Sequence, residues 1–413
     1  MNKRIISLIS VLMLYMSTFA SSIDTDRQWY LAGEAMKVSV TIDNAIIAYA
    51  ELCDTHNLVS GVIISINEGK GATTIELPSN LHSGYYDLSV YTRNNATVFH
   101  KLVAIINPLH KNQYDDIEWI LGDSCSITAV GPSDLINNKA IDVSEIEGHI
   151  VKARIKNKYI KANQIIPSLS IIGKQIHYFE GRMENDSIAT FYTYGIHGKL
   201  PLVLSAVTND GTHLPIEMIS PFVTLLPKKL PHLIFNYKRS EVEARSIEMQ
   251  RHQIAITPAK RELQLGDNSD ETTEVGDTLD YDDSVHGTKP YLSYNLNEYR
   301  QFQTIKEVLI EYVINVSKKK INGVTHLVVF GDQSPSYFSR PTLVLIDGMP
   351  IFDAERLLNY DARRIHHINI YSDQYTFGNG VYNGILSFVS RSGRLTNYPT
   401  EPNMQYLVYE FPQ

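Results

Sequence analysis

The feature of this sequence that most constrains its fold is a series of short segments in which apolar and polar residues alternate. Residues 37–42 (KVSVTI) alternate with period two, which is typical of a strand with one buried face. Similar runs, separated by turn residues such as those at 67–71 and 208–211, recur as far as about residue 226. Short strands at this spacing predict β-sandwich domains.

The expected strands fall into two groups, and the length of 413 residues is enough for two to four domains. We expect a first β-sandwich over residues 21–107 and a second over residues 108–226. The 25 tyrosines, compared with only 2 tryptophans, agree with a strand-rich chain. The expected strands lie at 37–42, 46–52, 61–66, 85–91, 150–155, 165–172, 175–179, 189–194 and 200–207.

Charge and cysteine content exclude several classes of function. The net charge is -8 and the pI is near 6.0, so no general attraction for nucleic acid is expected. The only cysteines are Cys53 and Cys125, which cannot form a disulfide framework or a cysteine-rich metal site. They either form one bridge in an oxidising compartment or stay as two separate thiols. We find no cofactor or metal motif.

The first twenty residues are typical of a secretory signal peptide. Lys3 and Arg4 precede an apolar run over residues 5–16, and Thr18 and Ala20 are small residues near the expected cleavage site. The apolar run is shorter than the roughly 20 residues that a spanning helix needs, although an uncleaved anchor is the alternative. We therefore expect an exported protein in the periplasm, at the outer membrane or on the cell surface, with peripheral membrane association left open.

Residues 227–290 are predicted to form a linker with an acidic segment. Residues 240–250 have helical character within it. Like charges keep an acidic segment extended and solvated. Calcium binding is the alternative, but the spacing of the acids does not fit a calcium-binding loop. The acidic residues are Asp267, Asp270, Glu271, Glu274, Asp277, Asp280, Asp282 and Asp283.

Residues 291–393 alternate between helical and strand patterns and predict a small α+β domain. Thr304 and Glu307 have the spacing of a capping box, and apolar residues follow at helical spacing. Strands are expected at 327–330, 342–346, 365–371 and 385–389, with a short helix capped by Asp353. The tail, residues 394–413, either adds a strand to its own chain or docks on a partner.

Five residues of this α+β domain form its structural motif: Asp347, Gly348, Pro350, Asp361 and Gly384. Asp347 and Gly348 are a turn pair, because glycine adopts a positive φ without strain and aspartate tolerates it. Pro350 then fixes the direction in which the chain leaves the turn. We therefore interpret Asp347 as a turn former rather than a catalytic acid.

The first sandwich resembles the macroglobulin-type domains of bacterial envelope proteins. The resemblance lies in residues 30–34 (YLAGE), 48–52 (AYAEL) and 83–86 (SGYY). Macroglobulins trap proteases through a thioester between a Cys and a Gln. The residues around Cys53 and Cys125 do not match that motif, so the resemblance does not extend to thioester chemistry.

The α+β domain resembles the plug domain of TonB-dependent outer-membrane receptors. The matching segments are residues 341–350, 361–370 and 383–388. Such receptors continue into a 22-stranded barrel, whereas 20 residues follow Gly393 here. We therefore do not expect a transporter. The resemblance implies a partner such as an outer-membrane β-barrel or another envelope protein, and residues 371–383 depart from the usual plug pattern.

The sequence has no Gly-x-Ser-x-Gly elbow, no His-Glu-x-x-His zinc helix and no phosphate-binding Gly-rich loop. His366 and His367 are adjacent in an expected strand, so their side chains should point to opposite faces. The sequence thus predicts a mainly β fold, with tandem immunoglobulin- or macroglobulin-like β-sandwich domains and a small α+β plug-like domain. The expected function is binding or scaffolding in the envelope, without catalysis. The alternatives are a hydrolase acting on glycan or peptide and a structural spacer.

Overall fold

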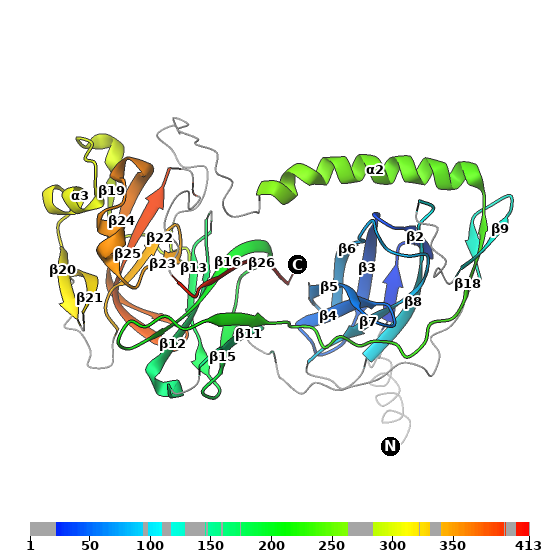
Figure 1. Cartoon of the computed structure of the whole chain (residues 1–413), viewed down its shortest axis with the longest axis horizontal. Helices are drawn as coiled ribbons and strands as arrows, with labels where there is room; N and C mark the ends of the chain where they lie inside the picture. The colour runs from blue at the N-terminus through cyan, green and yellow to red at the C-terminus, as the bar shows by residue number, and fades with distance from the viewer. Residues whose placement is uncertain are drawn as a thin grey trace, which may run out of the picture. The chain divides into compact units, whose positions relative to one another are not determined.

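The computed structural model describes residues 22–93, 98–109, 117–128, 145, 148–157, 160–173, 175–262, 284–321, 323–330, 340–391, 393 and 402–412. The expected signal peptide and the acidic segment lie outside these residues. The described chain is mainly β, as predicted (Figure 1). It divides into two compact units, which are described separately. Unit 1 comprises residues 1–148, 222–257 and 412–413, and unit 2 comprises residues 149–221 and 258–411.

Unit 1 contains the predicted first β-sandwich. One sheet has the order β1-β3-β6 and the other the order β2-β8-β7-β4-β5. Alternate residues such as Val38, Val40, Leu88 and Val90 point into the shared core. The strands are β1 (Ser22–Thr25), β2 (Trp29–Leu31), β3 (Ala35–Thr41), β4 (Ile47–Cys53), β5 (Leu58–Ser65), β6 (Lys70–Glu76), β7 (Gly84–Tyr91) and β8 (Val98–Ile106).

A third, small sheet and a long helix complete unit 1. The sheet is formed by β9 (Ile117–Leu121), β18 (Leu233–Tyr237) and β10 (Ser126–Ile127), and helix α2 (Arg239–Glu262) follows β18. The sheet and α2 as far as Thr257 belong to unit 1, so the structure differs here from the predicted boundaries of the second sandwich and the linker. Burial of apolar side chains explains the difference, because Leu233, Phe235 and Val242 join Trp29 and Leu31 in one cluster.

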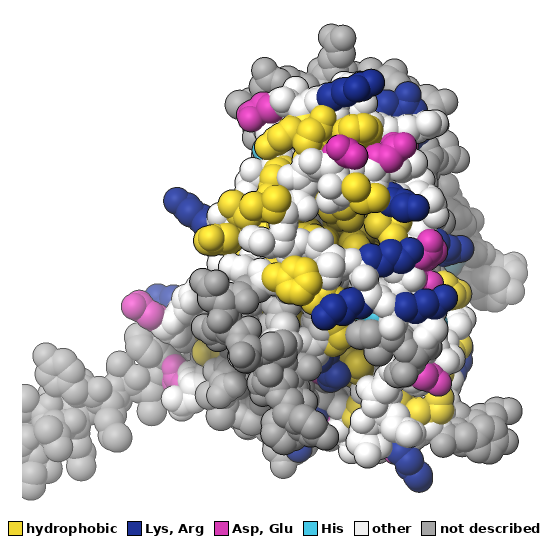
Figure 2. Space-filling view, turned by 90° about the vertical axis from the view of Figure 1, so that its left-hand side faces the viewer, with side chains coloured by type: hydrophobic (Ala, Val, Ile, Leu, Met, Phe, Trp, Pro, Cys, Tyr) yellow, Lys and Arg dark blue, Asp and Glu magenta, His cyan; other side chains and the backbone are white. Residues whose placement is uncertain are grey.

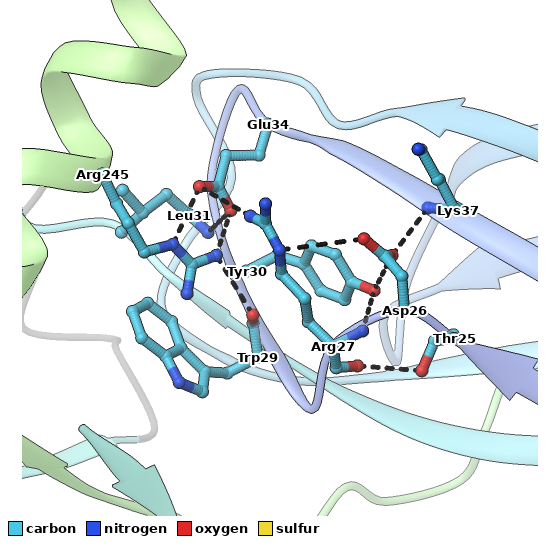
Figure 3. A network of polar contacts seen from close by, with 9 residues as sticks. All are labelled: Thr25, Asp26, Arg27, Trp29, Tyr30, Leu31, Glu34, Lys37 and Arg245. Atoms are coloured by element: carbon cyan, nitrogen blue, oxygen red, sulfur yellow. Dashed lines mark hydrogen bonds and ion pairs between the residues drawn. The ribbon is translucent and has the colours of Figure 1, made fainter. Parts of the chain in front are cut away.

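Arg245 and Glu34 bind helix α2 to the sandwich. The Arg245 guanidinium donates to Glu34 from Nε at 3.0 Å and forms an ion pair with the same carboxylate (Figure 3). It also lies 3.7 Å from the centre of the Trp29 ring, which is a favourable cation–π geometry. Glu34 accepts a further hydrogen bond from the backbone N–H of Leu31 at 2.8 Å. The buried carboxylate is therefore fully paired.

Another buried carboxylate, that of Glu51, lies on the face of the five-stranded sheet of unit 1 that points away from the sandwich core. It accepts hydrogen bonds from the backbone N–H groups of Val223 at 2.7 Å and Leu225 at 2.8 Å. The Tyr91 hydroxyl donates to it at 2.6 Å. Thr224 has a positive φ of 63°, and a left-handed residue makes neighbouring N–H groups converge on an anion. Glu51 thus binds residues 223–225 to the sandwich.

Unit 2 contains a second β-sandwich, with sheets of order β14-β15-β11-β17 and β13-β12-β16-β26. The tail supplies β26, which pairs along its length with β16, so the tail adds a strand to its own chain. The strands are β11 (His149–Ile155), β12 (Ile165–Ile171), β13 (His177–Glu180), β14 (Arg182–Met183), β15 (Ile188–Thr193), β16 (Gly198–Thr208), β17 (Ile216–Ile219) and β26 (Gln405–Phe411). A short helix, η1 (Ala162–Gln164), precedes β12.

The predicted α+β part forms a five-stranded sheet of order β19-β24-β25-β22-β23, with two helices and a hairpin. Thr304 and Glu307 form the predicted capping box, and Asp353 caps α4. The elements are β19 (Leu292–Asn295), η2 (Leu296–Glu298), α3 (Ile305–Glu311), β20 (Val316–Ile321), β21 (Val324–Val329), β22 (Leu343–Ile346), β23 (Met349–Pro350), α4 (Ala354–Leu358), η3 (Ala362–Arg364), β24 (Ile365–Phe377) and β25 (Gly380–Ser390).

Strands β24 and β25 are longer than the sequence predicts. The expected last strand begins at residue 385, whereas β25 begins at Gly380 and pairs with β24 up to Phe377. Tyr375, Phe377 and Tyr382 explain the extension, because their rings pack on the apolar cluster that contains Tyr178. The segment that departs from the plug pattern is therefore a hairpin.

The second sandwich and the α+β part share one hydrophobic core. Ile172 and Val203 of the sandwich are buried with Ile346, Met349 and Phe388 of the α+β sheet. The α+β part, which was predicted to begin at residue 291, therefore does not have a hydrophobic core separate from that of the second sandwich. Truncation of the chain at that position would expose these apolar side chains and remove β26 from its sheet.

We predict that Glu51→Ala destabilises unit 1 by about 3 kcal/mol, because it leaves buried backbone N–H groups without an acceptor. The only tryptophans, Trp29 and Trp119, both lie in unit 1, so urea unfolding followed by tryptophan fluorescence measures this unit. The exposed Glu118 provides a control, and Glu118→Ala should change stability by less than about 0.5 kcal/mol. Equal midpoints for the two variants would contradict the assigned role of Glu51.

Candidate functional site

Asp347 and Gly348 form the turn that the sequence predicts. Their φ angles are 45° and 87°. The Asp347 carboxylate is buried and accepts hydrogen bonds from the Ser390 N–H at 2.7 Å and hydroxyl at 2.5 Å. Burial raises the pKa of Asp347 to about 6, although the bonds from Ser390 lower it. The carboxylate thus binds the end of β25 to the turn and does not face a ligand site.

The other three motif residues also have local structural roles. Pro350 lies in β23 and pairs with Leu345. Asp361 caps the short helix η3 and forms an ion pair with Arg363 at 2.8 Å, which lowers the pKa of Asp361. Gly384 has a φ of 79°, and a Cβ there would meet the Tyr371 carbonyl oxygen at 2.8 Å. The contacts of the five motif residues are therefore to separate partners and do not build one site.

The expectation for His366 and His367 is wrong. Strand β24 has a register shift between Ile365 and His367, and the regular alternation of side chains fails at such a bulge. The two Nδ1 atoms are 2.5 Å apart and the ring centres are 4.2 Å apart. Two imidazoles alone are too few to bind a metal, and no cluster of three or more His, Cys, Asp or Glu suited to a metal occurs in the described parts of the chain.

A Ser, a His and an Asp meet on strands β7 and β8, but not as a catalytic triad. Ser89 Oγ donates to Asp87 Oδ2 at 2.7 Å, and His100 Nδ1 lies 2.9 Å from the same oxygen and 3.0 Å from Ser89 Oγ. In a triad the two histidine nitrogens serve the acid and the nucleophile separately. Here a single nitrogen, His100 Nδ1, faces both the acid and the hydroxyl. Ser89 and Asp87 are also fully buried.

Both cysteines are free. Cys53 is buried in β4, and burial raises the pKa of its thiol to about 12, with further contributions from the charges of Glu51 and Asp87. Cys125 is half-buried, and burial raises the pKa of its thiol too. A reactive cysteine needs an accessible thiolate, so neither thiol is placed to act as a nucleophile.

A shallow pocket, open to solvent and enclosing about 10 Å³, lies on the α+β part of unit 2. Its walls come from segments that are distant in sequence: the chain before α3, the inner face of α3, the short helix η3, and the residue after β25. Carboxylates are absent from this lining. The lining residues are Leu296, Tyr299, Arg300, Gln301, Phe302, Val308, Tyr312, Ala362, Arg363 and Arg391.

Aromatic rings and arginines dominate this pocket. The Tyr312 ring lies 4.7 Å from that of Tyr299 and 5.4 Å from that of Phe302. Of the arginines, Arg363 pairs with Asp361, and Arg391 donates from Nε to the Arg363 carbonyl oxygen at 2.7 Å. The result is an apolar floor with a cationic rim. We call this group of lining residues the aromatic–arginine pocket.

The end of unit 2 that carries α3 and the β20–β21 hairpin also exposes apolar side chains. Figure 2 shows them on this face, with Lys and Arg side chains beside them. Ile310 and Ile314 are 70% and 63% exposed, and Phe330 is 49% exposed. Lys319 lies 5.7 Å from the centre of the Phe330 ring. An exposed apolar patch with a charged border is typical of an interaction surface.

The sequence reasoning missed this pocket. It assigned the apolar residues near the Thr304 capping box only to a helix and made no prediction for the arginines. The local signal was the composition of residues 299–302 (YRQF), where aromatic residues and an arginine are adjacent. Arg363 and Arg391 carry no such signal, because only the fold brings them to the same place.

Comparisons with known proteins give weak likenesses. No family model matches the chain, and no curated protein matches it. Among solved structures, trypsin-activated α2-macroglobulin from Escherichia coli is similar over 49% of this chain and 16% of its own, at 11% identity and a TM-score of 0.20. The BSP domain of a biofilm-associated protein is similar over 53% and 30%, at 12% identity and a TM-score of 0.18.

A third similar structure contains the titin domains z1z2 in complex with telethonin, with 49% of this chain and 95% of that chain covered, at 12% identity and a TM-score of 0.16. This chain spans about a sixth of the E. coli macroglobulin. TM-scores this low carry no argument about function. Among the helices that the structure describes, none has the length and apolar character needed to cross a bilayer.

We predict that two buried groups of unit 2 give opposite pH dependences. Burial lowers the pKa of His286 to about 4 from 6.5, so its stabilising contribution is lost as the pH falls from 6.5 to 4. The pKa of Asp347 is raised to about 6 from 3.8, so its contribution is present at low pH and lost as the pH rises from 3.8 to 6. Each amounts to roughly 3 kcal/mol, at about 1.4 kcal/mol for each pKa unit.

The two effects should nearly cancel in the native chain, and single variants should separate them. Relative to the native chain, His286→Gln should gain stability as the pH falls from 6.5 to 4.5, and Asp347→Asn should lose it. Urea unfolding followed by far-UV circular dichroism at several pH values measures this. Variants whose stability runs parallel to that of the native chain would disprove both assignments.

We also predict that Gly348→Ala costs unit 2 more stability than Gly287→Ala. Both glycines have positive φ angles, 87° and 69°, so both variants lose about 1–2 kcal/mol from the backbone conformation. A Cβ at position 348 would also meet the Ile171 carbonyl oxygen at 2.6 Å, whereas position 287 faces open space. Unfolding midpoints should therefore be clearly lower for Gly348→Ala, and equal midpoints would show that the turn can move away from β12.

Proposed function

We propose that this chain is an exported binding or scaffolding protein of a Gram-negative envelope, and that it docks a partner through the aromatic–arginine pocket. The observation that carries this proposal is a pocket with three arginines, three aromatic rings and no carboxylate in its lining. Aromatic residues and arginine are the side chains most enriched at the energetic centres of interfaces. Figure 2 adds an exposed apolar face on the same part of unit 2.

The kind of partner follows from the sequence resemblances. Residues 341–350, 361–370 and 383–388 resemble the plug of TonB-dependent receptors, which sits inside an outer-membrane barrel. The first sandwich resembles macroglobulin-type envelope domains, and the first twenty residues are typical of a signal peptide. We therefore propose an outer-membrane β-barrel as the partner.

Catalysis has less support than binding. A hydrolase needs titratable groups that converge in an accessible cleft. The Asp87, Ser89 and His100 cluster is buried and has one histidine nitrogen facing both partners. The aromatic–arginine pocket offers no carboxylate as an acid or base. We therefore propose that the protein is not an enzyme. A purely structural spacer, the other alternative, would differ from the proposed binding protein in having no partner.

We predict that the full chain captures an outer-membrane β-barrel from detergent-solubilised envelopes, and that Arg300→Glu/Arg391→Glu does not. Two charge reversals at the pocket should repel the partner without removing apolar core. Point variants are preferable to deletion of residues 291–413, because the shared core and β26 would be lost with that segment. Mass spectrometry of the retained proteins identifies the partner.

The matched control is Arg154→Glu/Arg251→Glu, which makes the same charge change at two exposed positions that do not line the pocket. Its capture should equal that of the native chain. Retention of the barrel by all three chains would place docking elsewhere. No retained barrel with any of them would refute the proposed partner.

A further inference from the structure

The aromatic–arginine pocket has a composition that selects one class of ligand. Its floor is apolar, since Leu296 and Val308 are buried beneath the half-buried rings of Tyr299, Phe302 and Tyr312. The space that it encloses is about 10 Å³, which is room for about one water molecule. A ligand therefore lies across the rings at the surface and does not enter a cavity.

The rim of the pocket carries positive charge that the described carboxylates do not neutralise. The Arg363 guanidinium binds Asp361 through both Nε and Nη2 at 2.8 Å, so its charge is largely neutralised. Arg391 donates to a backbone carbonyl, which leaves its charge in place. Among the described residues, Arg300 and Arg391 form no ion pair with a carboxylate. Two guanidinium groups thus face the opening without an anion.

We propose that the pocket binds an extended peptide segment in which an aromatic side chain is flanked by Asp or Glu residues. This inference rests on the proposed function and names the chemistry of the docked segment. The aromatic side chain lies against the half-buried rings, where edge-to-face and stacked contacts are available. The flanking carboxylates bind Arg300 and Arg391, whose planar donors match a carboxylate in bidentate geometry.

A peptide fits this pocket better than a lipid surface does. The two unpaired cations of the pocket lie on different segments, one before α3 and one after β25. Carboxylates on both sides of an aromatic residue can reach both cations. A flat anionic surface would bind the exposed lysines of β20 equally well and would not require the pocket.

The test measures fluorescence anisotropy of the labelled peptide Asp-Glu-Tyr-Asp-Glu with the full chain. We expect binding that weakens with added salt, and a loss of about tenfold or more in affinity with Arg300→Glu/Arg391→Glu. Asp-Glu-Ala-Asp-Glu should bind at least about tenfold more weakly, because it lacks the aromatic side chain. The control Arg154→Glu/Arg251→Glu should bind as the native chain does.

Three other results would overturn the inference. Equal binding of the tyrosine and alanine peptides would show that charge alone acts. Binding of phosphatidylglycerol vesicles that competes with the peptide and is equally lost in Arg300→Glu/Arg391→Glu would assign the pocket to lipid. No peptide binding, together with barrel capture that depends on the pocket, would refute this ligand class and leave the proposed function standing. If neither peptide binding nor pocket-dependent barrel capture is observed, the proposed function is refuted as well.

Discussion

Buried carboxylates are the constraint on which this structure depends. A carboxylate taken out of water is costly unless charged or hydrogen-bonding partners meet it. Six such groups are buried in the described residues, and each meets a partner supplied by another segment. The pairs are Glu34 with Arg245, Glu51 with the backbone of residues 223–225, Asp87 with His100, Glu145 with Arg93, Glu180 with Arg340, and Asp347 with Ser390.

These pairs decide where connecting segments lie, while apolar burial supplies most of the stability. In unit 2, Glu180 at the end of β13 binds the Arg340 guanidinium and accepts a hydrogen bond from the Tyr382 hydroxyl at 2.7 Å. The Tyr178 and Tyr382 hydroxyls are 2.8 Å apart. An apolar core shared by Ile172 and Phe388 would tolerate small shifts of the sheet, whereas a bidentate ion pair would not.

The sequence predicted what depends on neighbours in the chain and missed what depends on distant contacts. Period-two alternation located most strands of both sandwiches, and the Thr304 capping box located α3. Strand β18 and the full length of α2 were missed, because their burial depends on Trp29 and Glu34, some 200 residues away. The bulge at His366 was missed because it is set by the pairing of β24 with β25.

The arginines of the pocket differ from those that bind buried carboxylates. The chain carries more acidic than basic residues, 45 against 37, and buried arginine-binding carboxylates occupy Arg93, Arg245 and Arg340. Arg300 and Arg391 are not buried and have no carboxylate partner in the described structure, beside three half-buried aromatic rings. Unlike Arg93, Arg245 and Arg340, they can bind an anion from outside, which is the ligand that we propose for the pocket.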